Sequence, residues 1–166
     1  MASSASWWGS KARQFRAHLR ARVAPEERAA LATWTTPEQC RLFDTMHVAD
    51  RRHGLDVVAA LRAARVTDPD ALIAALVHDA GKGATGVWPR VAYALGQLLG
   101  PWVWRAASFL PGFGAALDRL RDHPERSALM AAAAGCSTRT VELIRYQDDP
   151  RDTEFGELLR LADDAN

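Results

Sequence analysis

Cysteine is scarce in this sequence: Cys40 and Cys136 are the only two among 166 residues. Their spacing is not that of a zinc knuckle or of a redox motif, so two free buried thiols are the simplest interpretation, and a single disulfide is the alternative. The sequence also lacks the basic start and apolar run that mark a secretory signal. We therefore expect a cytoplasmic protein.

Long apolar runs and period-two alternation are also missing. The longest uncharged stretch, residues 91–104, is too short to cross a bilayer and contains Pro101. It belongs to a segment, Val87 to Leu117, whose only charges are Arg90 and Arg105. We expect this segment to form buried core or an apolar lid. Because no segment alternates convincingly between apolar and polar residues, we expect an all-α protein built as a single helical bundle.

Acidic residues are absent before Pro25, whereas this part of the chain contains five basic ones. From Glu142 onward acids outnumber bases, so the chain is electrically polarised although its net charge is only +1. That small net charge gives no reason to expect a nucleic-acid partner. Phe15, Leu19 and Val23 predict a basic amphipathic helix within an N-terminal segment, residues 1–36. This helix either packs on the body or makes a weak contact with an anionic membrane surface.

Residues 37–166 are predicted to form the metal-binding helical domain. Thr36 is a typical N-cap, and Pro37 suits the first position of a helix that turns Leu42, Phe43 and Met46 inward. Further helices are expected at about 49–64, from Asp68-Pro69 to a stop at Gly81 and Gly83, from Pro124 to Gly135, after Ser137, and at about 154–162.

Four ionisable residues fall at inward positions of these helices. His53 lies on an otherwise apolar helix face, His78-Asp79 end an apolar helix, and Asp163 ends the last one. Taken singly, each is explained by a hydrogen-bonded core histidine or a paired aspartate. Taken together they point to a metal, because buried charges need partners. Two imidazoles and two carboxylates suit one divalent ion of manganese, iron, cobalt, nickel or zinc, with water completing its coordination.

Four motifs follow one another in the sequence: Arg52-His53-Gly54, residues 74–82 reading AALVHDAGK, His123-Pro124-Glu125, and Leu161-Ala162-Asp163-Asp164. In this order they resemble the HD-domain superfamily of metal-dependent phosphohydrolases over about residues 37–166, with HDAGK as the specific part. The resemblance implies a bundle of the HD-domain type with a metal site between helices. It makes His53, His78, Asp79 and Asp163 the ligands. Asp164 replaces Asp163 if the helix is rotated by one residue, about 100°.

The chain departs from the family near its C-terminus. Two-metal members have a histidine matching His123 and then a His-His pair, where this chain reads Tyr146-Gln147. A single ion is therefore favoured. The resemblance suggests that Asp79 orients or deprotonates water, that Lys82 meets a phosphate oxygen, and that His123 hydrogen-bonds substrate or water. The alternatives are a solvated Lys82 at a helix end and a His123 that caps the following helix.

The implied function is hydrolysis of a nucleotide or another small phosphoester by water that the metal activates, with Lys82 and Arg52 offsetting negative charge. We expect a pocket open to solvent at the metal, with Lys82 and His123 on its rim and part of the Val87 to Leu117 segment as its wall. One alternative is a non-catalytic or regulatory module, because the His-His pair is missing. Another is a peripheral membrane protein acting on a lipid-like phosphoester, suggested by tryptophans at 7, 8, 88, 102 and 104.

Overall fold

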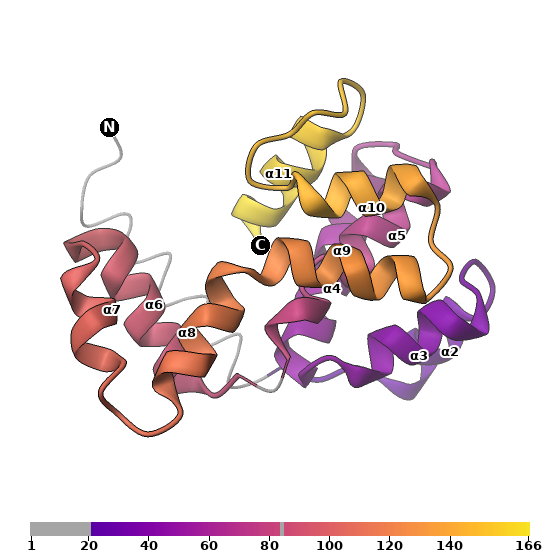
Figure 1. The fold of residues 1–166 in the computed structure, drawn as a ribbon. Coiled ribbons are helices and arrows are strands. Elements are labelled where there is room, and N and C mark those ends of the chain that lie inside the picture. Colours follow the sequence, from indigo (N-terminus) through magenta and orange to yellow (C-terminus); the bar gives the residue numbers. More distant parts are fainter. Residues whose placement is uncertain (1–20, 84) are drawn as a thin grey trace.

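The computed structural model describes residues 21–83 and 85–166, and every regular element in this part of the chain is a helix (Figure 1). The predicted all-α fold is confirmed. The helices are α2 (Pro25–Leu31), α3 (Pro37–Thr45), α4 (Val48–Ala63), α5 (Pro69–Val77), the 3-10 turn η1 (Ala80–Lys82), α6 (Val87–Leu99), α7 (Trp102–Ala107), α8 (Phe113–Arg121), α9 (His123–Ala133), α10 (Thr138–Arg145) and α11 (Gly156–Ala165). None of these helices is long and apolar enough to cross a bilayer.

Side-chain caps fix where α3 and α5 begin. The Thr36 hydroxyl accepts a hydrogen bond from the backbone amide of Gln39 at 3.2 Å. The Gln39 side chain in turn accepts one from the backbone amide of Thr36 at 2.9 Å. Asp68 accepts the amide of Ala71 at 3.0 Å in the same way before α5. Such caps satisfy amides that the helix itself leaves without partners. The predicted starts of α3 and α5 are confirmed.

The core forms around α5. All seven residues from Ala71 to Val77 are buried, because this helix has an apolar surface on every side. Phe43 of α3, Val57 of α4 and Ile144 of α10 are fully buried against it, and Leu31 of α2 joins the same cluster. A helix without a polar face must end inside the bundle. His78 and Asp79, the next two residues, are therefore buried as well.

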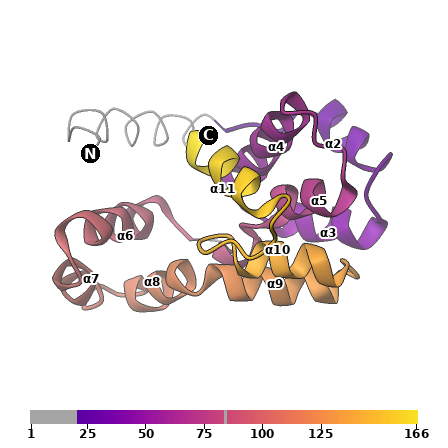
Figure 2. The same cartoon turned by 90° about the horizontal axis from the view of Figure 1, so that it is seen from above.

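Three helices, α6, α7 and α8, form a lobe that projects from the bundle in both views (Figures 1 and 2). Of the two alternatives expected for residues 87–117, buried core is wrong for much of the segment, since Trp88, Trp102 and Phe109 are exposed, and the apolar lid stays a prediction. The physical reason is that the lobe has a small core of its own. Tyr93 stacks on Trp104 with ring centroids 5.5 Å apart, and Trp104 packs on Gly96.

Two expected helix ends differ from the structure. α5 ends at Val77 rather than at the glycines, and η1 follows His78 and Asp79. Gly81 serves close packing, because a Cβ there would lie 2.5 Å from the carbonyl oxygen of His123 on α9. The last helix runs on to Ala165, so Asp163 lies within α11.

The basic helix expected around Lys11 to Val23 falls largely on residues 1–20, outside the described part of the chain. The proposed boundary after residue 36 stays a prediction. Leu31, which precedes that boundary, packs into the main core.

The contact between α4 and α5 gives a first prediction. Alanine usually stabilises a helix interior by about 0.5–1 kcal/mol relative to glycine. Gly54 should do the opposite, because a Cβ there would collide with the Leu76 carbonyl oxygen on α5. We expect Gly54→Ala to lower the free energy of unfolding by about 1–3 kcal/mol, as overpacking does, in urea denaturation.

Gly114→Ala in α8 is the matched control, since the nearest atom to its Cβ would be 3.9 Å away. This variant should be as stable as the wild type or more so. Equal effects of the two substitutions would contradict the close approach of α4 and α5.

Candidate metal centre

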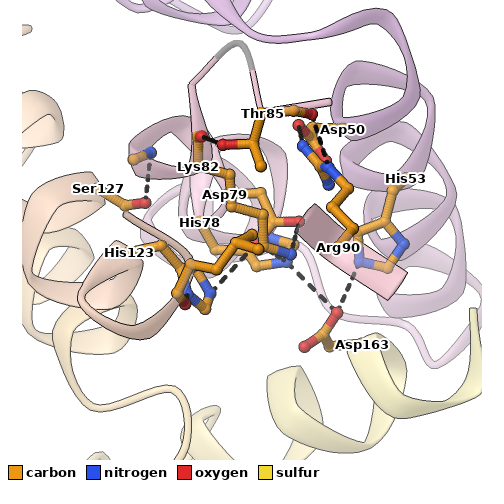
Figure 3. A network of polar contacts seen from close by, with 12 residues as sticks. Asp50, His53, His78, Asp79, Lys82, Thr85, Arg90, His123, Ser127 and Asp163 are labelled. Atoms are coloured by element: carbon orange, nitrogen blue, oxygen red, sulfur yellow. Dashed lines mark hydrogen bonds and ion pairs between the residues drawn. The ribbon is translucent and has the colours of Figure 1, made fainter. Parts of the chain in front are cut away.

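Side chains from three distant parts of the sequence meet at the end of α5 (Figure 3). His53 comes from α4, His78 directly follows α5, and Asp163 comes from α11. One ligand atom from each lies within 4.8 Å of the other two. The His53 Nε2 atom is 2.6 Å from Asp163 Oδ1, and His78 Nε2 is 3.4 Å from the same oxygen. The structure thus brings together three of the four predicted ligands.

The choice between the two C-terminal aspartates is decided by their directions on α11. Asp163 turns toward the two histidines, whereas Asp164 accepts a bond from Arg160 at 2.8 Å on the exposed side of the helix. Asp163 is therefore the carboxylate in position to bind a metal.

Local contacts fix the two imidazoles. Gly54 lets α4 approach α5 closely, and the rings of His53 and His78 lie with centroids 5.3 Å apart. The Nδ1 atom of His78 lies 2.9 Å from the Ala75 carbonyl oxygen. Because only a protonated Nδ1 can donate there, Nε2 of a neutral ring carries the lone pair and faces the cluster. A metal-binding histidine is normally held by such a bond from its other nitrogen.

Asp79 lies beside this group of three and not within it. Its Oδ1 is 3.4 Å from His78 Nε2 and 3.6 Å from His123 Nε2, while Oδ2 accepts a bond from the Lys82 ammonium at 2.6 Å. Direct ligation by Asp79 stays a prediction.

Two buried polar atoms at the floor of the cluster have no hydrogen-bond partner among the described residues: His78 Nε2 and Asp79 Oδ1. Each residue is only 2% exposed. An unsatisfied buried polar group typically costs about 1–3 kcal/mol. A cation between these atoms would satisfy both, and the mixed nitrogen and oxygen donors suit a divalent transition metal. The residues present therefore fit the predicted ion.

The cluster is closed at its floor and open at its edge. The side chains of Asp163, His53, Lys82 and His123 keep 39%, 24%, 22% and 15% of their surface exposed. The α11 side is the most open. A cavity of about 380 Å³ lined by Trp34, Val66 and Leu72 lies elsewhere, near the start of α5. Solvent therefore reaches the candidate site at its edge, as a site that exchanges water or substrate requires.

The charges of the cluster are strongly coupled. Burial lowers the pKa of His78, but Asp79 and Asp163 outweigh burial and raise that pKa to about 9. Burial raises the pKa of Asp163, yet its hydrogen bond with His53 and its interaction with His78, 3.4 Å away, hold that pKa far below its ordinary value. The pKa of Asp79 is likewise lowered, because His78 and Lys82 outweigh burial. Both carboxylates are therefore ionised at neutral pH, and without metal His78 carries a proton between them.

His123 is engaged on both ring nitrogens. Its Nδ1 lies 2.7 Å from the Leu120 carbonyl oxygen, and its Nε2 lies 3.0 Å from the side-chain nitrogen of Gln147. Burial, followed by the charge of Lys82, lowers the pKa of His123. A neutral ring that donates from Nδ1 and accepts at Nε2 satisfies both contacts. Its lone pair is occupied by Gln147, which supports the prediction of a single ion.

Arg52 has carboxylate partners in the structure, and two residues near the site, Asp50 and Arg90, were not identified from the sequence. Arg52 was expected to offset substrate charge, but it pairs with Glu27 at 2.6 Å and with Asp56, which occupy its guanidinium. Asp50 and Arg90 form a largely buried, bidentate ion pair that joins α6 to α4. Both of its hydrogen bonds are 2.7 Å long. Asp50 precedes His53 by one helical turn, and this spacing could have identified it.

No family model, no curated protein and no solved structure matches this chain. Its assignment therefore depends on the geometry described above and on the motifs of its sequence.

The geometry predicts one divalent ion per chain. Asp163→Asn should strongly weaken binding of manganese or zinc, whereas Asp164→Asn, its neighbour on the exposed side, should not. His78→Ala should abolish tight binding, and Tyr146→Ala should leave metal content unchanged. Elemental analysis measures the metal content of each variant, and calorimetry measures its metal affinity. Two equivalents in the wild type, or equal effects of the two aspartate variants, would refute the assignment.

The pKa of His78 gives a prediction about pH. Its value of about 9 in the folded chain exceeds the ordinary value of 6.5, so at pH 7 the ring is protonated and must lose its proton before it binds metal. Metal affinity should therefore rise with pH up to about 9, and each ion bound at pH 7 should release a proton. Titration calorimetry in buffers of different ionisation enthalpy measures the release, and a heat that does not depend on the buffer would contradict it.

Proposed function

We propose that this protein is a metal-dependent phosphohydrolase that acts on a nucleotide or another small phosphoester. One observation carries the proposal: His78 Nε2 and Asp79 Oδ1, two buried atoms without a hydrogen-bond partner among the described residues, lie at the floor of a cluster whose edge, at His53 and Asp163, reaches solvent. A structural metal normally has its coordination filled by protein, whereas a catalytic one keeps a position for water or substrate. The order of motifs resembling the HD-domain superfamily adds support.

A bound divalent ion would supply Lewis acidity, polarising a phosphoryl oxygen and lowering the pKa of water. Asp79 would orient that water. Its Oδ2 is held by Lys82 at 2.6 Å, which leaves Oδ1 as the acceptor that faces the cluster. Because the pKa of Asp79 lies far below its ordinary value, Asp79 is a weak base. This favours orientation of water over proton storage as its role.

Lys82 would contact the substrate phosphate. Burial lowers its pKa, but Asp79 and Asp50 outweigh burial and raise it, so the ammonium stays charged. An ammonium has three N–H donors. One of them goes to Asp79, and the side chain keeps 22% of its surface exposed. The remaining donors are suited to an anionic oxygen at the edge of the site.

His123 has a smaller role in this proposal than the sequence suggested. With its Nε2 lone pair accepting from Gln147, the ring would neither take a proton nor bind a metal directly unless Gln147 moved. Its contribution is to close the side of the site next to Asp79. The distance from His123 Nε2 to Asp79 Oδ1 is 3.6 Å.

A second candidate function is a non-catalytic module in which one ion clasps α4, the end of α5 and α11 together. The contact between Gln147 and His123 favours it, because this contact fills with protein a position that could otherwise face substrate. In that case the metal would raise stability and no turnover would occur.

Turnover separates the two candidates. Asp79→Asn removes the charge but keeps the size of the side chain, and we expect it to reduce hydrolysis of an activated phosphoester by at least about 100-fold. Asp56→Asn serves as the control, because the Asp56 carboxylate pairs with Arg52 rather than with a residue of the cluster. Steady-state rates are measured with added manganese across nucleotide mono-, di- and cyclic phosphates. A wild type that binds metal, gains thermal stability and hydrolyses none of them would exclude the enzyme and support the clasp.

A further inference from the structure

The outer end of the projecting lobe carries five exposed apolar side chains, which we call the lobe tip. Their exposed fractions are 45% for Leu98, 53% for Leu99, 61% for Trp102, 89% for Phe109 and 51% for Leu110. Scattered single apolar residues are normal on a protein surface, but a local group of large ones usually marks a binding surface.

These five residues lie close together in the fold. Leu98 and Leu99 end α6, Trp102 begins the six-residue helix α7, and Phe109 and Leu110 follow it. Such a helix is only about 9 Å long. The indole nitrogen of Trp102 donates to the Leu99 carbonyl oxygen at 2.9 Å. This bond links the end of α6 to the start of α7. In both views α7 is the part of the lobe farthest from the bundle (Figures 1 and 2).

The aromatic contact inside the lobe does not involve these side chains. It is made by Tyr93 and Trp104, whose rings stack and whose indole nitrogen donates to the Tyr93 carbonyl oxygen at 3.0 Å. The Asp50–Arg90 ion pair holds the start of α6 on the bundle. The tip residues take no part in these contacts, and their exposed surface is available to a partner.

The charge around the tip has one sign. Residues 87–117 contain no acidic residue, and Arg90 is already paired with Asp50. Among the described residues no carboxylate pairs with Arg105, which lies in the last turn of α7 and is exposed. The tip thus combines an aromatic and aliphatic surface with an unopposed positive charge.

We propose that the lobe tip docks on the surface of an anionic lipid bilayer. Tryptophan favours the boundary between headgroups and acyl chains, and phenylalanine and leucine supply apolar area below it. Arg105 meets the anionic headgroups. A second copy of this chain fits the tip less well, because a two-fold contact would bring identical positive surfaces together. The proposal does not depend on the phosphohydrolase activity.

Vesicle binding by the full-length chain tests the proposal. The wild type should sediment with vesicles of equal parts phosphatidylcholine and phosphatidylglycerol, and less with phosphatidylcholine alone. Trp102→Ser combined with Phe109→Ser should weaken that binding by at least about tenfold, the scale of losing two buried aromatic side chains. Arg105→Gln should weaken it on anionic vesicles only, and salt should reduce that difference.

Leu129→Ser combined with Leu161→Ser is the matched control, since both leucines are exposed on the bundle, at 58% and 51%. This variant should bind vesicles like the wild type. Every variant keeps residues 1–24, so binding through that basic stretch would be equal in all of them. Circular dichroism checks that each variant is folded.

Three outcomes would overturn the proposal. The first is a wild type that binds neither vesicle. The second is binding that the tip substitutions leave unchanged. The third is a dimer in size-exclusion chromatography that the tip substitutions dissociate while no vesicle binding occurs, which would assign the tip to a second copy of this chain.

Discussion

Because every residue from Ala71 to Val77 is buried, α5 carries the two ionisable residues that follow it into the interior of the bundle. A buried histidine and a buried aspartate need charges of the opposite sign, or a cation, near them. The rest of the cluster meets this need. Lys82 reaches back to Asp79, and α11 brings Asp163 to both histidines. The close approach of α4 at Gly54 places His53 beside them.

The same arrangement lets a proton and a metal ion compete for one place. Without metal, the two lowered carboxylate pKa values and the raised pKa of His78 describe an imidazolium held between two anions. A divalent ion would bring greater charge to the same donors and would leave coordination positions for solvent on the α11 side. It would also link α4, α5 and α11, which are far apart in the sequence. A clasp and a catalytic centre therefore share their ligands and differ in whether those open positions are used.

The sequence predicted the features that local patterns control. Capping residues such as Thr36 and Asp68 located helix starts, and burial-averse residues on apolar faces identified His53, His78 and Asp163. It did not predict features that depend on tertiary packing. The tryptophan-rich segment forms a projecting lobe because Tyr93 and Trp104 pack on each other, which no periodicity reveals. Gln147 reaches His123, and Asp50 reaches Arg90 across forty residues, only once the helices are in place.

A metal ion at this cluster would be held by two imidazoles and at least one carboxylate. Pulsed electron paramagnetic resonance of the manganese-loaded protein, with its histidines labelled with nitrogen-15, counts imidazole ligands directly. We expect coupling to two histidine nitrogens, with one lost in His53→Ala and no change in His123→Ala. A spectrum without imidazole coupling, or with a third histidine nitrogen that disappears in His123→Ala, would contradict it.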